Sequence, residues 1–318
     1  MRLSVANKKE EAHEDCIWTA GWAPKGSGYQ LLTGSVDETV KAWSEDISTL
    51  GTNFTGHTLG VVSITLHSSG VWAGSSALDS FIRLWDHNNS STKAIIETPP
   101  SETWQIAFQP NVAEPVVAAA GGSSNKITLW GTEPQEGATE EKGKELRSYL
   151  LPAGDDKHKR ERFVMSVAYS PDGKLVACGT QIGTVAIFDV EAGKLISILE
   201  GHYKPVRSLT FTPDSTMLLT ACDDMHTHLY DVKHASLIEA FSGHESRVLS
   251  VSCHPSGNAF ATGSSDAKVK LWNLSTRSLE QTANEHSDQV WGVAFRPDGQ
   301  QLASVSDDKS VVLYSFSE

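Results

Sequence analysis

Short runs of alternating apolar and polar residues make up most of the chain. The clearest example begins with the run Val248–Cys253, passes through the turn Pro255–Gly257, and continues with runs at 259–264 and 268–272. Alternation with a period of two residues is typical of half-buried β-strands, and Pro and Gly favour tight turns between them. The pattern therefore predicts consecutive antiparallel strands.

The same pattern can be aligned seven times, because an aromatic residue ends the third run of each repeat. Successive aromatics lie 42, 45, 58, 42, 42 and 42 residues apart along the numbering. The four-stranded blades of WD40 propellers repeat every ~40–45 residues. We therefore expect an all-β protein, a seven-bladed WD40 β-propeller in which residues 1–318 form a single domain. The aromatics are Trp43, Trp85, Trp130, Phe188, Tyr230, Trp272 and Tyr314.

The last repeat has room for only three strands, because the chain ends at 318. The amino-terminal run Leu3–Asn7 leads into His13 much as the run Leu279–Asn284 leads into His286. A ring left open would expose the edge of a sheet, which proteins avoid. We therefore expect the amino-terminal strand to complete the last blade and to close the propeller.

Five of the repeats share a set of four residue types at fixed spacing. A His opens the repeat, an Asp lies six residues before the aromatic, and a Ser or Thr lies four residues before the Asp. Repeats three and four lack the set. Its members are His13, Thr33, Asp37 and Trp43; His57, Ser75, Asp79 and Trp85; His202, Thr220, Asp224 and Tyr230; His244, Thr262, Asp266 and Trp272; and His286, Ser304, Asp308 and Tyr314.

His, Ser and Asp together also suggest a hydrolase triad, but a catalytic site is needed only once. Five copies at one period favour a structural tetrad, in which Asp accepts a hydrogen bond from His, His bonds the hydroxyl, and the hydroxyl bonds the aromatic side chain. Each such bond contributes about 0.5–1.5 kcal/mol net. We expect Tyr230 and Tyr314 to keep their hydroxyl groups in this network.

A second repeated position lies at the start of the innermost strand, near the mouth of the central channel. Its residues include aromatic, Met and Arg side chains, which are enriched at protein interfaces. The alternative is that some of these side chains pack between blades. The residues are Trp18, Val62, Trp104, Met165, Arg207, Leu249 and Trp291.

Carboxylates are predicted beside these aromatic side chains. Asp223 and Asp307 each precede a tetrad Asp, and Asp15 and Asp288 lie in loops that lead into the innermost strands. A carboxylate next to an aromatic plane suits a guanidinium group, although solvated turn carboxylates are an equally good explanation for each Asp alone. We therefore predict that an Arg-containing peptide of a partner binds here. The candidate residues are Trp18, Trp104, Arg207, Asp223, Trp291 and Asp307.

The overall charge and the apolar runs narrow the classes of partner. The chain has 39 Asp and Glu against 26 Lys and Arg, a formal net charge of −13. Nucleic-acid binding relies on clustered basic residues, so we expect no direct nucleic-acid ligand. No apolar run approaches the ~18–20 residues of a membrane span, so we expect no membrane partner.

We expect neither an enzyme nor a metal or cofactor site. No Gly-rich phosphate loop and no nucleophile elbow is present, and the four Cys residues form no Cys-x-x-Cys pair. His226 and His228 offer two possible metal ligands on one strand, but no third ligand at metal-site spacing accompanies them.

The gap between the third and fourth aromatics exceeds the period by about 16 residues. The surplus falls within residues 131–162, which are rich in Glu, Lys, Arg and Gly. Low hydrophobicity and mixed charge predict a charged insertion loop between blades 3 and 4.

Several stretches resemble one family of WD-repeat proteins. Residues 56–62, 75–86, 199–209 and 286–299 are similar to the WD-repeat subunit shared by the RNA-polymerase-II-associated factor (Paf) complex and the Ski complex, and Val305–Ser310 is most like its plant branch, vernalization independence three. Asp288–Phe295 is the most diagnostic segment.

The resemblance implies a non-enzymatic scaffold in the nucleus and cytoplasm. Paf complex subunits, which act in transcription elongation and histone modification, would be partners. So would the tetratricopeptide scaffold and helicase of the Ski complex, which acts in exosome-linked mRNA decay. Partners of this family present a Gln-Arg-x-x-aromatic segment to the top of the propeller. Two departures lie near this face: Arg247 replaces an aromatic, and Met225 replaces a Gly.

Two other functions fit a propeller. A substrate receptor of a cullin ubiquitin ligase often carries Trp-Asp-x-Arg after the third strand, which the repeats here lack. A reader of histone tails or other arginine peptides would use an Arg-accepting central channel, which the predicted site allows.

Overall fold

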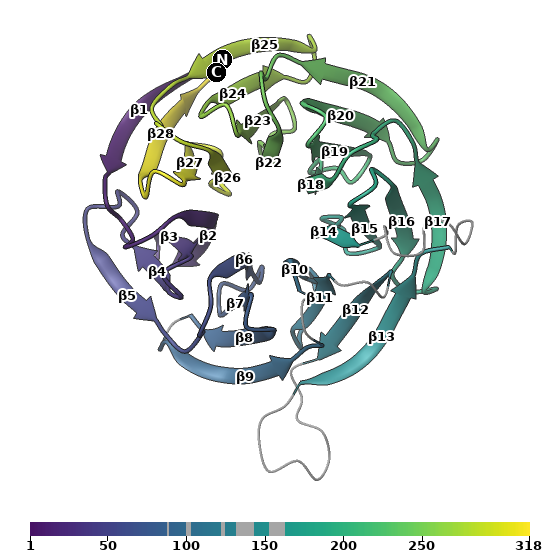
Figure 1. The fold of residues 1–318 in the computed structure, drawn as a ribbon, viewed down its shortest axis with the longest axis horizontal. Helices are drawn as coiled ribbons and strands as arrows, with labels where there is room; N and C mark the ends of the chain where they lie inside the picture. Colours follow the sequence, from purple (N-terminus) through teal and green to yellow (C-terminus); the bar gives the residue numbers. More distant parts are fainter. Residues whose placement is uncertain (88, 100–102, 122–124, 132–142, 153–162) are drawn as a thin grey trace.

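The computed structural model describes residues 1–87, 89–99, 103–121, 125–131, 143–152 and 163–318. Within these ranges the chain forms seven four-stranded antiparallel sheets and no helix. The sheets stand as blades around a central axis, with β2, β6 and their equivalents nearest the axis (Figure 1). The predicted seven-bladed all-β propeller is confirmed. No described element is a helix that could cross a membrane.

Blades 1 to 6 each take four consecutive strands, and blade 7 takes the last three strands together with the first. Blade 1 consists of β2 (Ile17–Lys25), β3 (Gly28–Ser35), β4 (Val40–Trp43) and β5 (Leu50–Phe54), and blade 2 of β6 (Val61–Leu66), β7 (Trp72–Ala77), β8 (Phe81–Asp86) and β9 (Ser91–Glu97). Blade 3 consists of β10 (Gln105–Phe108), β11 (Val116–Ala120), β12 (Lys126–Gly131) and β13 (Lys144–Leu150), and blade 4 of β14 (Val164–Tyr169), β15 (Leu175–Thr180), β16 (Val185–Asp189) and β17 (Lys194–Leu199). Blade 5 consists of β18 (Val206–Phe211), β19 (Met217–Cys222), β20 (His226–Asp231) and β21 (Ser236–Ser242), and blade 6 of β22 (Val248–Cys253), β23 (Ala259–Ser264), β24 (Val269–Asn273) and β25 (Ser278–Ala283). Blade 7 consists of β26 (Val290–Phe295), β27 (Gln301–Ser306), β28 (Val311–Ser317) and, at its outer edge, β1 (Arg2–Lys9).

The amino-terminal strand closes the ring, as predicted. Strand β1 pairs antiparallel with β28, from Arg2 opposite Ser317 to Lys9 opposite Val311. A second contact ties β1 to blade 6, because the side-chain amide of Gln281 accepts from the Leu3 N–H at 2.7 Å and donates to the Leu3 carbonyl at 2.8 Å. Both ends of the chain therefore lie together at one blade (Figure 1).

The hydrophobic core lies between neighbouring blades rather than inside one blade. Leu31 and Trp43 of blade 1 pack in one cluster with Val305 and Leu313 of blade 7. Each sheet presents apolar side chains to the blade on either side, so burial requires a neighbour. Packing of this kind holds the blades at fixed angles and fixes the positions of the loops around the channel.

The predicted insertion loop at 131–162 needs correction. Gly131 ends β12, and residues 144–150 form β13, the outer strand of blade 3. Only Tyr149 of β13 is fully buried, because an outer strand covers a blade on one side only. The sequence of β13 is therefore as polar as that of a surface loop. The rest of the predicted insertion, at 132–142 and 153–162, lies outside the described residues.

Candidate partner-binding face of the propeller

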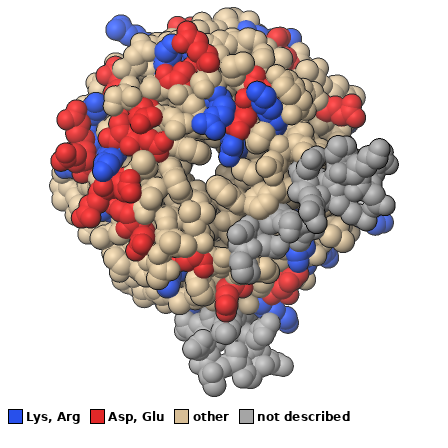
Figure 2. All heavy atoms as spheres, in the orientation of Figure 1, with Lys and Arg blue, Asp and Glu red and all other residues tan. Residues whose placement is uncertain are grey.

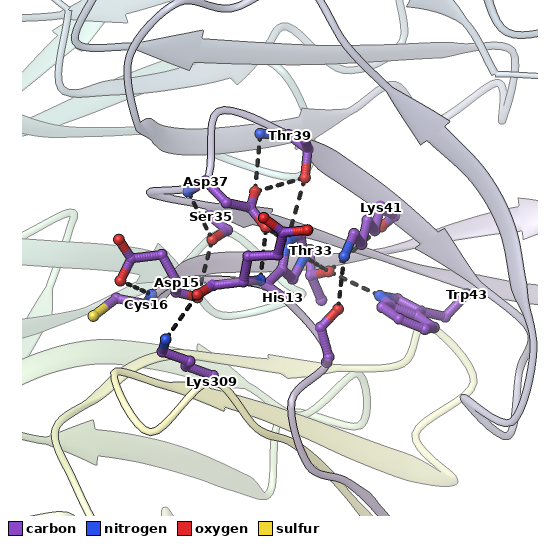
Figure 3. A network of polar contacts seen from close by, with 12 residues as sticks. His13, Asp15, Cys16, Thr33, Ser35, Asp37, Thr39, Lys41, Trp43 and Lys309 are labelled. Atoms are coloured by element: carbon purple, nitrogen blue, oxygen red, sulfur yellow. Dashed lines mark hydrogen bonds and ion pairs between the residues drawn. The ribbon is translucent and has the colours of Figure 1, made fainter.

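The structural tetrad fastens two loops at one end of blade 1 (Figure 3). His13 Nδ1 lies 2.8 Å from Asp37 Oδ2, and His13 Nε2 lies 2.8 Å from Thr33 Oγ1. The indole N–H of Trp43 donates to the same hydroxyl at 2.9 Å. His13 comes from the loop before β2, and Asp37 from the turn between β3 and β4. The tetrad therefore holds these two loops together on one face of the ring, which we call the top face.

The other four blades repeat the His–Asp and His–hydroxyl contacts. The Trp272 indole also donates to Thr262 at 2.9 Å. The Nδ1–Asp and Nε2–hydroxyl distances are 2.9 and 2.6 Å at His57, 2.6 and 2.8 Å at His202, 2.8 and 2.7 Å at His244, and 3.0 and 2.7 Å at His286.

The two tyrosines do not complete their tetrads, contrary to the prediction. The Tyr230 hydroxyl bonds His228 Nδ1 at 2.9 Å instead of Thr220, because His228 lies two residues earlier on the same strand. The Tyr314 hydroxyl is buried close to the tetrad hydroxyl of Ser304, which acts on its pKa, but it makes no hydrogen bond of ordinary length with the described residues. A phenol hydroxyl extends from the ring in a different direction from an indole N–H, so neither tyrosine repeats the bond that Trp43 and Trp272 make.

The tetrad carboxylates remain ionised. Burial alone would raise the pKa of Asp266, but the hydrogen bond and charge of His244 and two backbone N–H donors outweigh it and lower the pKa to about 2. The same causes lower the pKa of Asp224 to about 2 and lower the pKa values of Asp37, Asp79 and Asp308. These His–Asp pairs are positioned to hold loops rather than to react.

The seven repeated side chains at the start of the innermost strands line one cavity, as expected from their shared position. Its volume is about 370 Å³, and it opens along the central axis. The indole rings of Trp18 and Trp291 lie 5.9 Å apart at an angle of 50°. Trp104 makes an edge contact with Phe163, with ring centroids 6.1 Å apart. The three indoles therefore line the mouth of the channel and are not packed entirely between blades.

The structure corrects the predicted roles of Arg207 and Asp223. Arg207 Nε and Nη2 donate to the two oxygens of Asp223 at 2.9 and 2.7 Å. Asp223 is only 8 % exposed. The carboxylate is thus neutralised within blade 5, and a partner guanidinium would have to displace Arg207. The sequence contained a signal for this pair, because Arg207 and Asp223 were both assigned to the same face of the propeller.

Asp307 has two side-chain neighbours, Gln289 and Cys16. Gln289 Nε2 donates to Asp307 Oδ2 at 3.1 Å, Oδ1 is buried without a hydrogen bond of ordinary length in the described chain, and the Cys16 thiol lies beside the carboxylate. Burial, together with Asp307 and Asp15, raises the pKa of the neighbouring Cys16 thiol to about 12. Cys16 therefore stays protonated, and the negative charge at this point of the rim resides on Asp307 and Asp15.

Acidic side chains extend this negative region outward. Figure 2 shows them gathered over blades 7 and 1, with basic side chains beside the central opening. Two lysines here direct their ammonium groups to backbone carbonyls, Lys41 to Ala12 at 3.0 Å and Lys309 to Glu14 at 2.7 Å, while Lys8 divides its ammonium group between the Glu285 carbonyl at 3.1 Å and the Glu10 carboxylate at 3.3 Å. The exposed carboxylates of this sector are therefore incompletely neutralised.

One cluster has the residue types of a metal site. Ligand atoms of His202, Cys222 and Asp224 lie within 4.8 Å of one another. However, His202 uses both ring nitrogens in its tetrad, and Cys222 Sγ donates to the Lys204 carbonyl. Cys222 occupies the position of Ser35 and Ser264, which hold the Asp turn in other blades. The cluster is part of the blade 5 tetrad together with Cys222, which replaces the serine that holds the Asp turn in other blades.

Fold and tetrads together define a WD40-repeat propeller. The family description "WD domain, G-beta repeat" matches residues 7–44, 48–86, 193–231, 235–273 and 277–315, and a second description, the WD40 domain of anaphase-promoting complex subunit 4, matches 147–205. The first matches more than half of the sequence, so the chain belongs to the WD40-repeat family. Each of its five matches contains the four residues of one tetrad.

Among individual proteins, the chain is 45% identical to WD repeat-containing protein VIP3 of Arabidopsis thaliana over 215 residues, which are 65% of this chain and 64% of VIP3. It is 34% identical to WD repeat-containing protein SL1-17 of Schistosoma mansoni over 63% of this chain and 61% of that protein. The matched region spans less than two thirds of either relative. The predicted resemblance to VIP3 is confirmed.

Proposed function

We propose that the protein is a non-enzymatic interaction scaffold that serves Paf-type and Ski-type assemblies in the nucleus and cytoplasm. Its partners would be Paf complex subunits and the tetratricopeptide scaffold and helicase of a Ski complex, without direct contact to nucleic acid or membrane. The likeness to VIP3 supports this assignment. A rigid disc with five structural tetrads supports a platform role, since the fold itself supplies no chemistry.

The observation that carries the proposal is the chemistry of the channel mouth. The Trp18 and Trp291 indoles line a cavity of about 370 Å³, and Asp307 and Asp15 lie next to Cys16, two residues before Trp18. A guanidinium group can stack on an indole and form charge-assisted hydrogen bonds with a carboxylate at the same time. We infer that an arginine side chain of the partner binds at this point. Asp307 and Asp15 are the acceptors, because Asp223 is already paired.

Affinity purification followed by mass spectrometry tests the proposed assemblies. The full chain, tagged in its own cells, should recover elongation factors, a helicase with a tetratricopeptide protein, or both. The double variant Trp291→Ala with Asp307→Ala should lose these partners. Asp231→Ala is the matched control, because Asp231 lies at the opposite end of β20 from the top face. Partners that bind the double variant as well as the unmodified chain would refute the proposed site.

Titration with a labelled Gln-Arg-Ala-Ala-Phe peptide tests the arginine contact directly. Fluorescence anisotropy should show binding at least tenfold weaker to the double variant, since buried charge-assisted contacts contribute about 1.5–3 kcal/mol. Replacing Arg by Ala in the peptide should weaken binding to the unmodified chain by a similar factor. Equal affinity of the two peptides would contradict an arginine site.

A further inference from the structure

One repeated position on the top face carries, in blade 6, a charge that forms no ion pair with any described residue. In five blades, the residue immediately before the tetrad Asp donates its backbone N–H to the carbonyl of a residue in the loop before the innermost strand. The residue at the same position in blade 4, which has no tetrad, makes the same bond. We call the residue whose carbonyl accepts this bond the rim position. The rim residues are Cys16, Gly60, Phe163, Pro205, Arg247 and Gln289, and Arg247 is the only cation among them.

Arg247 is exposed and has one hydrogen-bond partner. Its Nη2 donates to Gln289 Oε1 at 3.0 Å, and Gln289 in turn donates to Asp307 Oδ2 at 3.1 Å. Within the described part of the chain, no carboxylate forms an ion pair with Arg247. A guanidinium group has five N–H donors, so most of the donor capacity of Arg247 faces solvent.

In the neighbouring blade 5, an arginine is paired with a carboxylate of its own blade. Arg207 forms a bidentate ion pair with Asp223, and its side chain is only 21% exposed. The equivalent of Asp223 in blade 6 is Ser265, whose hydroxyl is buried without a partner and offers no charge. Blade 6 therefore has a cation at its rim but lacks the internal carboxylate that blade 5 supplies to its own arginine.

The rim thus presents two opposite charges on adjacent blades. Arg247 of blade 6 and Asp307 of blade 7 are separated by the single side chain of Gln289, which bonds both. Blades 2 to 4 complete the mouth with apolar groups, including Val62, Trp104 and Met165. A ligand that carries only positive or only negative charge would leave either Arg247 or Asp307 without an opposite charge. Unpaired charges and like-charge contacts weaken binding, and a protein interface uses them to exclude wrong partners.

We infer that the top face selects a partner segment that carries both a negative and a positive charge, in which a carboxylate binds Arg247 and an arginine binds beside Asp307. The arginine half rests on the proposed function, whereas the carboxylate half rests on Arg247 alone. Carboxylate and guanidinium match in planar, bidentate geometry, so an Asp or Glu side chain or a free carboxyl terminus fits. Complementary charge draws the segment across the rim from blade 6 to blade 7.

A random library tests both halves without a known partner. Phage-displayed 12-residue peptides are selected on the immobilised full chain, on Arg247→Glu, and on Arg277→Glu as a matched control. Arg277 is an exposed blade 6 arginine in the turn between β24 and β25, at the opposite end of these strands from the top face. Thermal unfolding verifies that all three proteins are folded. We expect Asp or Glu to be enriched near an Arg in pools from the unmodified chain and the control, and to be depleted in pools from Arg247→Glu.

Anisotropy with a selected peptide gives the magnitude. The unmodified chain should prefer the acidic peptide to its Glu→Lys counterpart by about threefold to tenfold, as expected for a charge pair near solvent, and Arg247→Glu should reverse the preference.

The outcomes separate the two proposals. If acidic residues are not enriched, or are still enriched on Arg247→Glu, the carboxylate site is refuted. If Arg is enriched in the same pools, the arginine site of the proposed function is upheld. Acidic enrichment without Arg upholds the carboxylate site and refutes the arginine site. If no peptide is enriched above the uncoated surface, both are wrong.

Discussion

At the scale of single residues, the tetrad carboxylates show how a charge can be buried safely. Asp266 receives hydrogen bonds from His244 Nδ1 at 2.8 Å and from two backbone N–H groups, those of Glu245 and Lys268, at 3.0 Å each. A buried carboxylate with several donors is more stable in its charged form, which is why its pKa is low despite burial.

Substitution of this carboxylate should destabilise the fold. Asp266→Asn removes the charge and leaves His244 and the turn N–H groups poorly satisfied, so the free energy of unfolding should fall by about 1–3 kcal/mol. Urea unfolding measures the change. The control Asp231→Asn alters a partly exposed carboxylate whose side-chain partner is the exposed His234, and it should change stability by less than about 0.5 kcal/mol. Equal effects of the two substitutions would contradict the role of the tetrad.

Acid should act through the same groups. Since the folded pKa of Asp266 is about 2, below its ordinary 3.8, the unfolded chain binds more protons between these values. Stability from this carboxylate is complete above about pH 5 and is lost as the pH falls toward 2. Urea midpoints measured from pH 6 to pH 2.5 should decline, and Asp266→Asn should decline less steeply. Parallel curves would show that Asp266 is not linked to folding.

At the scale of elements, the residue after the third strand fills the gap toward the neighbouring blade. His87 follows β8, and its N–H donates to the Val71 carbonyl. Val232 and Leu274 occupy the same position in blades 5 and 6, with equivalent backbone bonds. The ring of His87 is buried, and neither nitrogen has a hydrogen-bond partner in the described chain. Burial, with the charge of Lys25, lowers its pKa, so it is neutral.

His87→Leu should therefore stabilise the protein. The substitution removes two unsatisfied buried nitrogens and introduces the apolar residue type found in blades 5 and 6, for a gain of about 1 kcal/mol or more. The matched control is His254→Leu, because His254 is buried with both nitrogens bonded, to Ser256 Oγ at 2.7 Å and the Gly299 carbonyl at 3.0 Å. Thermal unfolding should show a rise for the first variant and a fall for the second; effects of the same sign would refute this explanation.

At the scale of the whole molecule, stability depends on closing the ring. Strand β1 covers the edge of β28 and bonds Gln281 of blade 6 through Leu3. Between blades 7 and 1, the buried Arg296 of blade 7 pairs with Glu45 of blade 1 and lies over the rings of Trp22 and Tyr29. Strand pairing therefore completes blade 7, and apolar packing and an ion pair join that blade to blade 1.

Deletion of residues 1–9 should open this closure. The edge of β28 would be left unpaired, and exposed strand edges promote association. We expect a lower unfolding temperature and concentration-dependent oligomers in size-exclusion chromatography. Val5→Ala, which trims an exposed side chain but leaves β1 intact, should behave like the unmodified chain. A monomeric deletion variant of unchanged stability would show that β1 is dispensable.

Much of this architecture follows from the sequence alone, because strand alternation, blade period and tetrads are local patterns repeated many times. One strand of blade 3, β13, escaped recognition, since an outer strand buries only one side and Tyr149 is its single fully buried residue. Tyr230 was misassigned for a similar reason, because its hydroxyl partner, His228, belongs to no repeated column.

The sequence by itself determined the number of blades, the manner of closure and the residues at the channel mouth, since each is set by position within a repeat. Only the tertiary structure decided which charges are free. Whether Arg207 neutralises Asp223, or Gln289 connects Arg247 to Asp307, depends on side-chain directions and distances between blades. Electrostatic interactions change strongly over a few ångströms, and no repeat pattern encodes that separation.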